Sequence, residues 1–182
     1  MFEQLLERLA GALDRHRIPY MIIGGQAVLV YGEPRLTRDI DVTVGLDANR
    51  TDTIVALARE LGLGIRVEHP GEFVRDTMVL PCEDTPTGIP VDFIFSHSPY
   101  EAEALSRVRR VIVGSSEVAF ASLEDLIIHK LIAGRPRDLE DVRIILLKNR
   151  TYDRAYVAKW LVEFDNLLDR PLARQLKELD PG

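Results

Sequence analysis

One segment, Asp39-Ile40-Asp41-Val42, constrains the fold more than any other because charged and apolar residues alternate along it. Residues two apart on a β-strand point to the same face, so both carboxylates project together while Ile40 and Val42 face the core. Two like charges held this close repel, and one carboxylate takes up a proton unless a cation lies between them. Mg²⁺ suits that position, since it prefers hard oxygen ligands and commonly binds one or two protein carboxylates with substrate phosphates. We therefore predict a strand over 39–44 that carries a metal site; the alternative is a solvated strand face.

A pair of glycines, Gly24-Gly25, follows the short apolar run 20–23 and precedes the apolar segment 26–31. This order predicts a strand, a tight turn and a helix. Glycines at such a turn let the backbone approach a ligand closely, and the first N–H groups of the helix attract an anion. Taken alone, the pair is better explained as an ordinary tight turn.

Basic residues lead directly into the paired aspartates, as Arg35-Leu36-Thr37-Arg38. Guanidinium groups suit phosphate oxygens through their charge and forked donors, although two surface arginines in a loop are common. A third carboxylate, Asp92, lies in the apolar run 91–95, where it needs solvent, a partner or a metal, because burying an unpaired charge is costly. We take Asp92 as the third member of the metal site; a solvent-facing strand position is the alternative.

The remaining hydrophobic periodicity predicts a mixed sheet with flanking helices, followed by a helical tail. Before residue 121 we expect helices near 2–13 and 54–61, and strands near 73–80, 91–95 and 109–113. The proline- and glycine-containing segment 81–90 is predicted to be a long hairpin loop that includes Cys82.

After residue 121 the pattern is helical. Ser122, three residues before Asp125, predicts the start of a helix over 123–133, and Gly134 its end. Two more helices are expected near 139–146 and 157–164, with Asp138 as the N-cap of the first of them. The fold class is therefore α/β (α+β), a small mixed β-sheet flanked by helices. We divide the chain into a core over 1–120 and a helical extension over 121–182.

Composition restricts the class of protein further. The 182 residues are 46% hydrophobic and 29% charged, which is ordinary for a globular chain. A net charge of −6 argues against a broad nucleic-acid-binding surface, although a local basic patch at Arg107, Arg109 and Arg110 remains open. The single cysteine excludes an internal disulfide and a cysteine-based zinc cluster. No apolar run reaches membrane-spanning length and the start of the chain lacks a signal-peptide pattern, so we expect a cytoplasmic protein without a membrane partner.

Together, the Gly-Gly pair, the run Arg35 to Asp41 and the later Asp92 resemble the nucleotidyltransferase superfamily typified by DNA polymerase beta. A second run resembles the C-terminal motif of the AbiEii-like and related minimal nucleotidyltransferases, and its matching residues are Lys130, Arg135, Asp138 and Asp141. The chain departs from the pattern in two ways. Gly25 stands where many of these enzymes have serine, and the chain is shorter than the full-length toxins.

The resemblance implies a magnesium-dependent enzyme that moves a nucleoside monophosphate from a nucleoside triphosphate, such as ATP, to a hydroxyl acceptor. The implied catalytic and metal-binding residues, holding two Mg²⁺ ions, are Asp39, Asp41 and Asp92. The implied nucleotide-binding residues are Gly24, Gly25, Arg35, Thr37, Arg38 and Lys130. It leaves open whether the acceptor is RNA, a protein or a small molecule, and whether the chain is a toxin–antitoxin component. The oligomeric state is also left open.

Two other classes stay open at this point. A glycosyltransferase also uses a DxD pair to bind a metal and a nucleotide, but the Gly-Gly pair would then be unexplained. A catalytically silent nucleotidyltransferase-fold module, acting as a binding partner or antitoxin, is the second; the three intact aspartates speak against it. His129 is expected to be a packed or surface histidine rather than a ligand.

Overall fold

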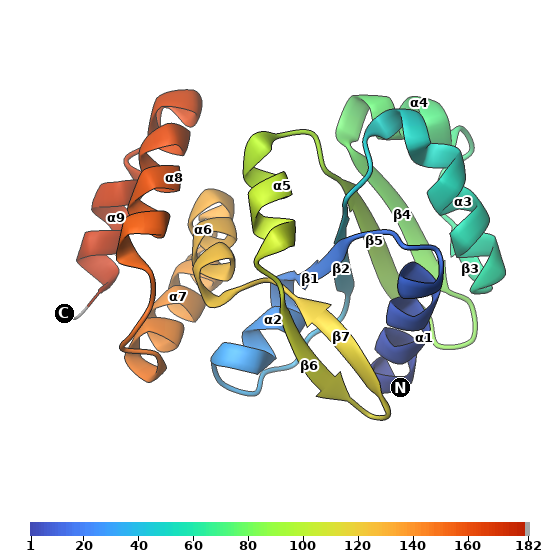
Figure 1. The fold of residues 1–182 in the computed structure, drawn as a ribbon, viewed down its shortest axis with the longest axis horizontal. Helices are drawn as coiled ribbons and strands as arrows, with labels where there is room; N and C mark the ends of the chain where they lie inside the picture. The colour runs from blue at the N-terminus through green and yellow to red at the C-terminus, as the bar shows by residue number, and fades with distance from the viewer. Residues whose placement is uncertain (181–182) are drawn as a thin grey trace.

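A seven-stranded mixed sheet runs through the centre of the computed structural model, which describes residues 1–180 (Figure 1). The strands lie in the order β3 (Leu63–Ile65), β4 (Val79–Asp84), β5 (Ile89–Phe95), β2 (Ile40–Val44), β1 (Tyr20–Ile23), β7 (Ser116–Phe120) and β6 (Arg109–Val113). The helices of residues 1–180 are α1 (Phe2–Arg15), α2 (Gly24–Tyr31), α3 (Thr51–Glu60), α4 (Pro70–Thr77), α5 (Pro99–Ser106), α6 (Leu123–Ala133), α7 (Pro136–Lys148), α8 (Arg154–Leu168) and α9 (Leu172–Leu179), with a 3₁₀ turn η1 at Ala48–Arg50. The predicted fold class is confirmed.

The pairing between strands is antiparallel except at two places. β2 pairs with β5, and β1 with β7, in parallel. The parallel β2–β5 register sets Asp41 directly beside Asp92, and the antiparallel β1–β2 register sets Ile23 beside Asp41. Directly paired residues point to the same face of a sheet. Segments about fifty residues apart in the sequence thereby bring two of the three predicted carboxylates to one face.

The core lies mainly under the central strands. Ile40 and Val42 of β2 and Val91 and Phe93 of β5 are all fully buried, whereas Asp41 and Asp92 between them are only partly buried. This alternation is the strand pattern that the sequence predicts for 39–44, although β2 itself begins at Ile40. The buried face therefore fixes the orientation of both carboxylates.

The C-terminal helices α6 to α9 gather at one side of the molecule, where α6 packs against α2, α7 and α8 (Figure 1). The predicted bounds of α6 are confirmed. The side chain of Ser122 accepts a hydrogen bond from the backbone N–H of Asp125, and Gly134 ends the helix in the left-handed conformation with φ of 64°. A glycine adopts that conformation without steric cost. Among the helices of residues 1–180, none is both long and apolar enough to span a bilayer.

The predicted strand at 73–80 and the predicted loop at 81–90 are wrong. Residues up to Thr77 belong to α4, and β4 then runs to Asp84, so that the turn before β5 covers only 85–88. Cys82 is accordingly buried in a strand. Pro81 is tolerated in β4 because its backbone faces the end of the short strand β3. Proline lacks a backbone N–H, and at this position few hydrogen bonds between the strands depend on it. The sequence patterns also missed β3, β7, α5 and α9.

We expect Ile40→Ala to lower the free energy of unfolding by about 2–5 kcal/mol, because it leaves a cavity beneath the central strands. Leu167→Ala is the control, since this leucine is 76% exposed on α8 and should change stability by less than about 0.5 kcal/mol. Urea unfolding of both variants measures the difference. Equal effects would place Ile40 outside the core.

Candidate active site

Gly24 opens α2 directly after β1 and lies against the carboxylate of Asp41. Its φ is 64°, and a Cβ built at this position would overlap Asp41 Oδ2. A residue with a side chain would therefore be strained in its backbone and would displace the carboxylate. The helix begins at the first glycine rather than at residue 26, so the predicted turn is part of the helix.

The second glycine supports the loop that leads into β2. A Cβ at Gly25 would lie 2.8 Å from Thr37 Cγ2, so the serine found at this position in many nucleotidyltransferases does not fit unless Thr37 moves. The side chain of Gln26 donates a 2.6 Å hydrogen bond to Thr37 Oγ1, and both residues are buried. Thr37 thereby fixes the loop over the start of α2.

The three predicted carboxylates interact electrostatically. Burial, Asp39 and Asp92 together raise the pKa of Asp41 to about 6, against a weaker opposing effect of Lys130 and Arg135. Burial and the charge of Asp39 also raise the pKa of Asp92, while Arg66 lowers it. Among residues 1–180, no group of three or more His, Cys, Asp or Glu side chains is arranged as a ready-made metal site. Asp39 precedes β2 and is exposed.

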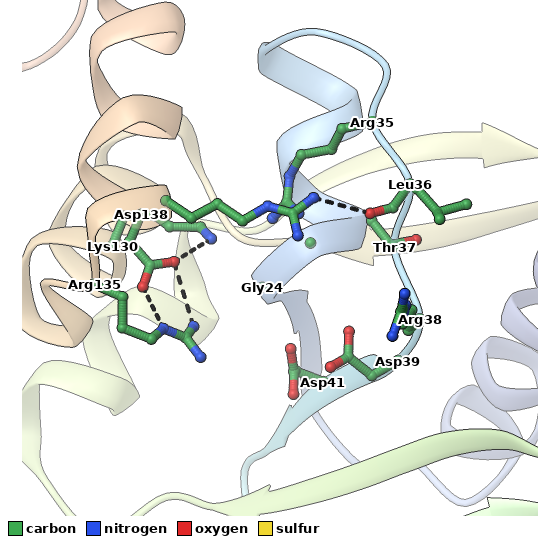
Figure 2. A pocket seen from close by; sticks show the side chains of 12 residues that line it. Gly24, Arg35, Leu36, Thr37, Arg38, Asp39, Asp41, Lys130, Arg135 and Asp138 are labelled. Carbon is green, nitrogen blue, oxygen red and sulfur yellow. Dashed lines mark hydrogen bonds and ion pairs between the residues drawn. The ribbon is translucent and has the colours of Figure 1, made fainter.

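A pocket of about 250 Å³ lies above Asp39 and Asp41, whose carboxylates stand side by side below Gly24 (Figure 2). Its lining comes from Gly24 and Gly25 of α2, Arg35 to Asp39 in the loop, Asp41 of β2, and Lys130, Arg135, Arg137 and Asp138 around the α6–α7 turn. Five of these side chains are cationic and three are anionic. The pocket thus combines a carboxylate floor with basic walls, a combination that suits a metal-bound polyphosphate.

Eight of the nine predicted site residues line this pocket, and Asp92 does not. Asp92 lies one strand further along the sheet, beside Asp41. Arg135 and Arg137 also line the pocket, although the sequence patterns gave neither a role in nucleotide binding. Arg137 donates to the backbone oxygen of Leu36 at 3.2 Å and so ties α7 to the loop. Arg135 is a matching residue of the second motif, whereas Arg137 is not one of its matching residues and only lies between two of them, Arg135 and Asp138.

Lys130 is buried in a cluster of charges between α6, α7 and the loop. Its Nζ lies 2.7 Å from Asp138 Oδ1 and 2.9 Å from Asp141 Oδ2. Arg35 reaches Asp141 at 3.1 Å, and Arg135 Nε lies 2.5 Å from Asp138 Oδ2. Burial by itself raises the pKa of Asp138, but hydrogen bonds from Arg135 and Lys130 outweigh it and hold that pKa below its usual value. The cluster therefore contains three cations and two carboxylates.

The expectation that Asp138 is a helix N-cap is wrong. The N-cap of α7 is Arg135, and Asp138 lies within the first turn, where its carboxylate is held by side chains. Its charge still favours the helix N-terminus.

The residues of the suspected basic patch are largely engaged within the protein. Arg107 lies over the ring of Tyr156 at 3.8 Å and pairs with Glu124, and Arg110 pairs with Asp14. His129 packs against the ring of Tyr100 at 5.7 Å, as expected for a packed histidine.

Comparison with known proteins gives one family match. The sequence profile of the family described as "Nucleotidyl transferase AbiEii toxin, Type IV TA system" matches residues 4–178. No curated protein sequence is significantly similar to this chain.

Several solved structures share the fold. The solution structure of the antibiotic-resistance factor ANT(2'')-Ia has a TM-score of 0.62 and 16% identity, over 92% of this chain and 95% of that chain. A crystal structure of ANT(2'')-Ia in complex with adenylyl-2''-tobramycin has a TM-score of 0.57 and 18% identity, over 80% and 87%. An antigenic nucleotidyltransferase-like protein from Paracoccidioides brasiliensis has a TM-score of 0.58 and 16% identity, over 96% and 91%. At these identities the likeness concerns the fold alone.

Lys130→Ala should lower the free energy of unfolding by about 3–5 kcal/mol, because it leaves Asp138 and Asp141 buried without their shared cation. Arg135→Ala should cost no more than about 1 kcal/mol, since the Arg135 side chain is 75% exposed. Chemical unfolding of the two variants tests this contrast. A small loss for Lys130→Ala would show that the cluster is not closed in solution.

The contribution of Asp41 to the stability of the metal-free protein should fall as the pH rises from about 4 to about 6. The folded state holds the Asp41 proton with a pKa of about 6, above the ordinary value of 3.8, so it binds more protons than the unfolded chain in this window. Asp41→Asn should raise the free energy of unfolding by about 1–3 kcal/mol near pH 7.5 and by less near pH 4. Urea unfolding of the wild type and of Asp41→Asn at both pH values, in the presence of a chelator, measures these effects. An increase in the free energy of unfolding that is the same at both pH values would contradict the raised pKa of Asp41.

Proposed function

The chain belongs to the AbiEii nucleotidyl transferase family, and on this premise we propose that it transfers a nucleoside monophosphate from a nucleoside triphosphate to a hydroxyl acceptor with the help of Mg²⁺. One observation carries the proposal furthest. The β2–β5 register sets Asp41 beside Asp92, while Gly24 brings the start of α2 and the basic pocket against the same carboxylate.

The donor set fits magnesium. Asp39, Asp41 and Asp92 offer hard oxygen atoms. Burial, followed by the charges of Asp39 and Asp92, raises the pKa of Asp41, and a bound cation would offset both effects. These three side chains would hold one Mg²⁺ ion or, as we propose, two. Bound Mg²⁺ would supply charge stabilisation to the attacking and leaving oxygens of an in-line displacement.

The basic walls of the pocket would hold the triphosphate. Arg38 is exposed beside Asp39, and Arg35, Thr37 and the backbone of Gly24 and Gly25 border the same space. Lys130 is engaged with two carboxylates, so we assign it the role of organising the cluster that presents Arg35 and Arg135 to the outer phosphates. The leaving pyrophosphate would be neutralised on this side of the site.

The reaction forms a bond between the acceptor oxygen and the α-phosphorus and breaks the bond to pyrophosphate. Asp92 would accept the proton of the acceptor hydroxyl. Burial and the charge of Asp39 raise the pKa of Asp92, which makes this carboxylate a better base than an exposed aspartate.

The acceptor is proposed only as a class. The family description names a toxin of a type IV toxin–antitoxin system, and one structural neighbour was solved in complex with adenylyl-2''-tobramycin. RNA, a protein hydroxyl and a small molecule all remain compatible acceptors. We propose that this chain is the enzymatic component of such a system.

Incubation of the protein with an α-labelled nucleoside triphosphate, Mg²⁺ and fractions of cell extract should label an acceptor. Asp41→Asn should reduce the labelling at least about a hundredfold, because it removes a carboxylate from the centre of the proposed site. Asp169→Asn is the matched control and should retain full labelling. Asp169 is exposed with φ of 51°, a conformation that asparagine adopts readily.

Two results would contradict the proposal. Labelling that survives Asp41→Asn would move the chemistry elsewhere in the molecule. Absence of labelling with any of the common triphosphates, in RNA, protein and small-molecule fractions, would favour a silent binding module.

A further inference from the structure

The position of Asp92 indicates from which side an acceptor approaches. The pocket lies on the side of Asp41 that faces α2 and the α6–α7 turn, whereas β5 lies on the other side of β2. In an in-line displacement the nucleophile and the leaving group occupy opposite sides of the phosphorus. If pyrophosphate leaves towards the basic pocket, the acceptor hydroxyl lies near Asp92, above β5 and β4.

A row of paired residues continues across the sheet from Asp92. Asp92 is paired with Pro81 of β4, and the backbone N–H of Arg66 donates to the backbone oxygen of Pro81 at 3.0 Å. Arg66 directly follows β3, and it continues the register in which Gly64 pairs with Glu83. Paired residues point to the same face, so Asp41, Asp92, Pro81 and Arg66 lie in one line on the same face. Neighbouring strands are about 4.8 Å apart, so the guanidinium of Arg66 can reach the space beside Asp92.

The chemistry of this face is mixed apolar and cationic close to Asp92. Pro81, Pro90 and Ile94 are only partly buried on it, and Arg66 is exposed. Glu83 belongs to the same face but lies further from Asp92, opposite Pro90. Within residues 1–180, the exposed side chain of Arg66 makes no ion pair, so its guanidinium is available to an anionic ligand.

We propose that Arg66 is an acceptor-binding residue, which holds a phosphate group adjacent to the reacting hydroxyl, with Pro81 and Ile94 supporting the acceptor's sugar. This inference rests on the proposed function, because it takes Asp92 as the proton acceptor. The ligand chemistry is a hydroxyl next to a phosphate, whether at the end of a nucleic-acid strand or in a sugar phosphate. A polycationic aminoglycoside does not match, since Arg66 repels it.

Binding to the acceptor side can be measured while the nucleotide pocket is filled. The protein is saturated with Mg²⁺ and a non-hydrolysable triphosphate analogue, and three probes are titrated separately: a four-nucleotide RNA with a free 3′ hydroxyl, ribose 5-phosphate and tobramycin. Arg66→Glu should weaken binding of a phosphate-bearing probe at least about tenfold, because it replaces a charge-assisted contact with repulsion. The RNA and ribose 5-phosphate arms distinguish a strand end from a sugar phosphate.

Arg59→Glu is the matched control, since Arg59 is an exposed arginine of α3 that carries no ion pair within the described residues. It changes the net charge equally and should leave binding within about twofold of the wild type. Arg66→Lys should restore part of the affinity, because lysine keeps the charge but not the fork.

Three outcomes would overturn the inference. These are equal weakening by Arg66→Glu and Arg59→Glu, unchanged binding in Arg66→Glu, and failure of both phosphate-bearing probes to bind the wild type. Calorimetry with the triphosphate analogue and Mg²⁺ separates this failure from that of the proposed function. The analogue should bind the wild type and both glutamate variants alike, and its failure to bind the wild type would count against the enzyme itself.

Discussion

The parallel pairing of β2 with β5 is the constraint on which the site depends. Ile40, Val91 and Phe93 are fully buried around Asp41 and Asp92, so the register cannot slip by one residue without turning the carboxylates into the core. The same pairing brings two acidic groups together. Burial raises the pKa of both, and the charge of Asp39 adds to the effect on each, with Asp92 contributing further to that on Asp41. The hydrophobic core thus holds an arrangement that electrostatics opposes, and such an arrangement is expected where a ligand supplies the missing cation.

The second constraint is the charge cluster around Lys130, which makes the C-terminal helices part of the site. The pocket draws Lys130 and Arg135 from the predicted extension over 121–182 and most of its remaining lining from 1–120. Arg35 contacts Asp141, and Arg137 contacts Leu36. These contacts join the two predicted parts of the chain, 1–120 and 121–182. A buried cluster of this kind contributes little net stability by itself, but it fixes geometry, since each member loses its partners if another moves.

The sequence predicted those features that depend on local pattern. The alternation around Asp41, the glycine pair and the capping residues of α6 each act within a few residues, and all three appear in the structure. The strand at 73–80 failed because an apolar residue pair around Phe73 is compatible with either a helix or a strand. Three further features depend on tertiary structure. They are the pairing of Lys130 with Asp138 and Asp141, the hydrogen bond from Gln26 to Thr37, and the row from Asp92 to Arg66. Spacing alone could therefore propose the site residues but not their partners.

Asp41 and Asp92 differ in the cations that surround them, and this difference gives the site a direction. Burial and neighbouring carboxylates raise the pKa of both aspartates, and the cations that oppose this effect differ: Lys130 and Arg135 act on Asp41 from the pocket side, whereas Arg66 acts on Asp92 from the opposite side. A single basic cluster would attract polyphosphate without orienting it. Cations at both ends of a line of carboxylates can instead hold two anionic groups apart, one on each side of the phosphorus. The line Asp41–Asp92–Pro81–Arg66 follows directly from strand register, so this polarity is a property of the sheet rather than of any flexible loop.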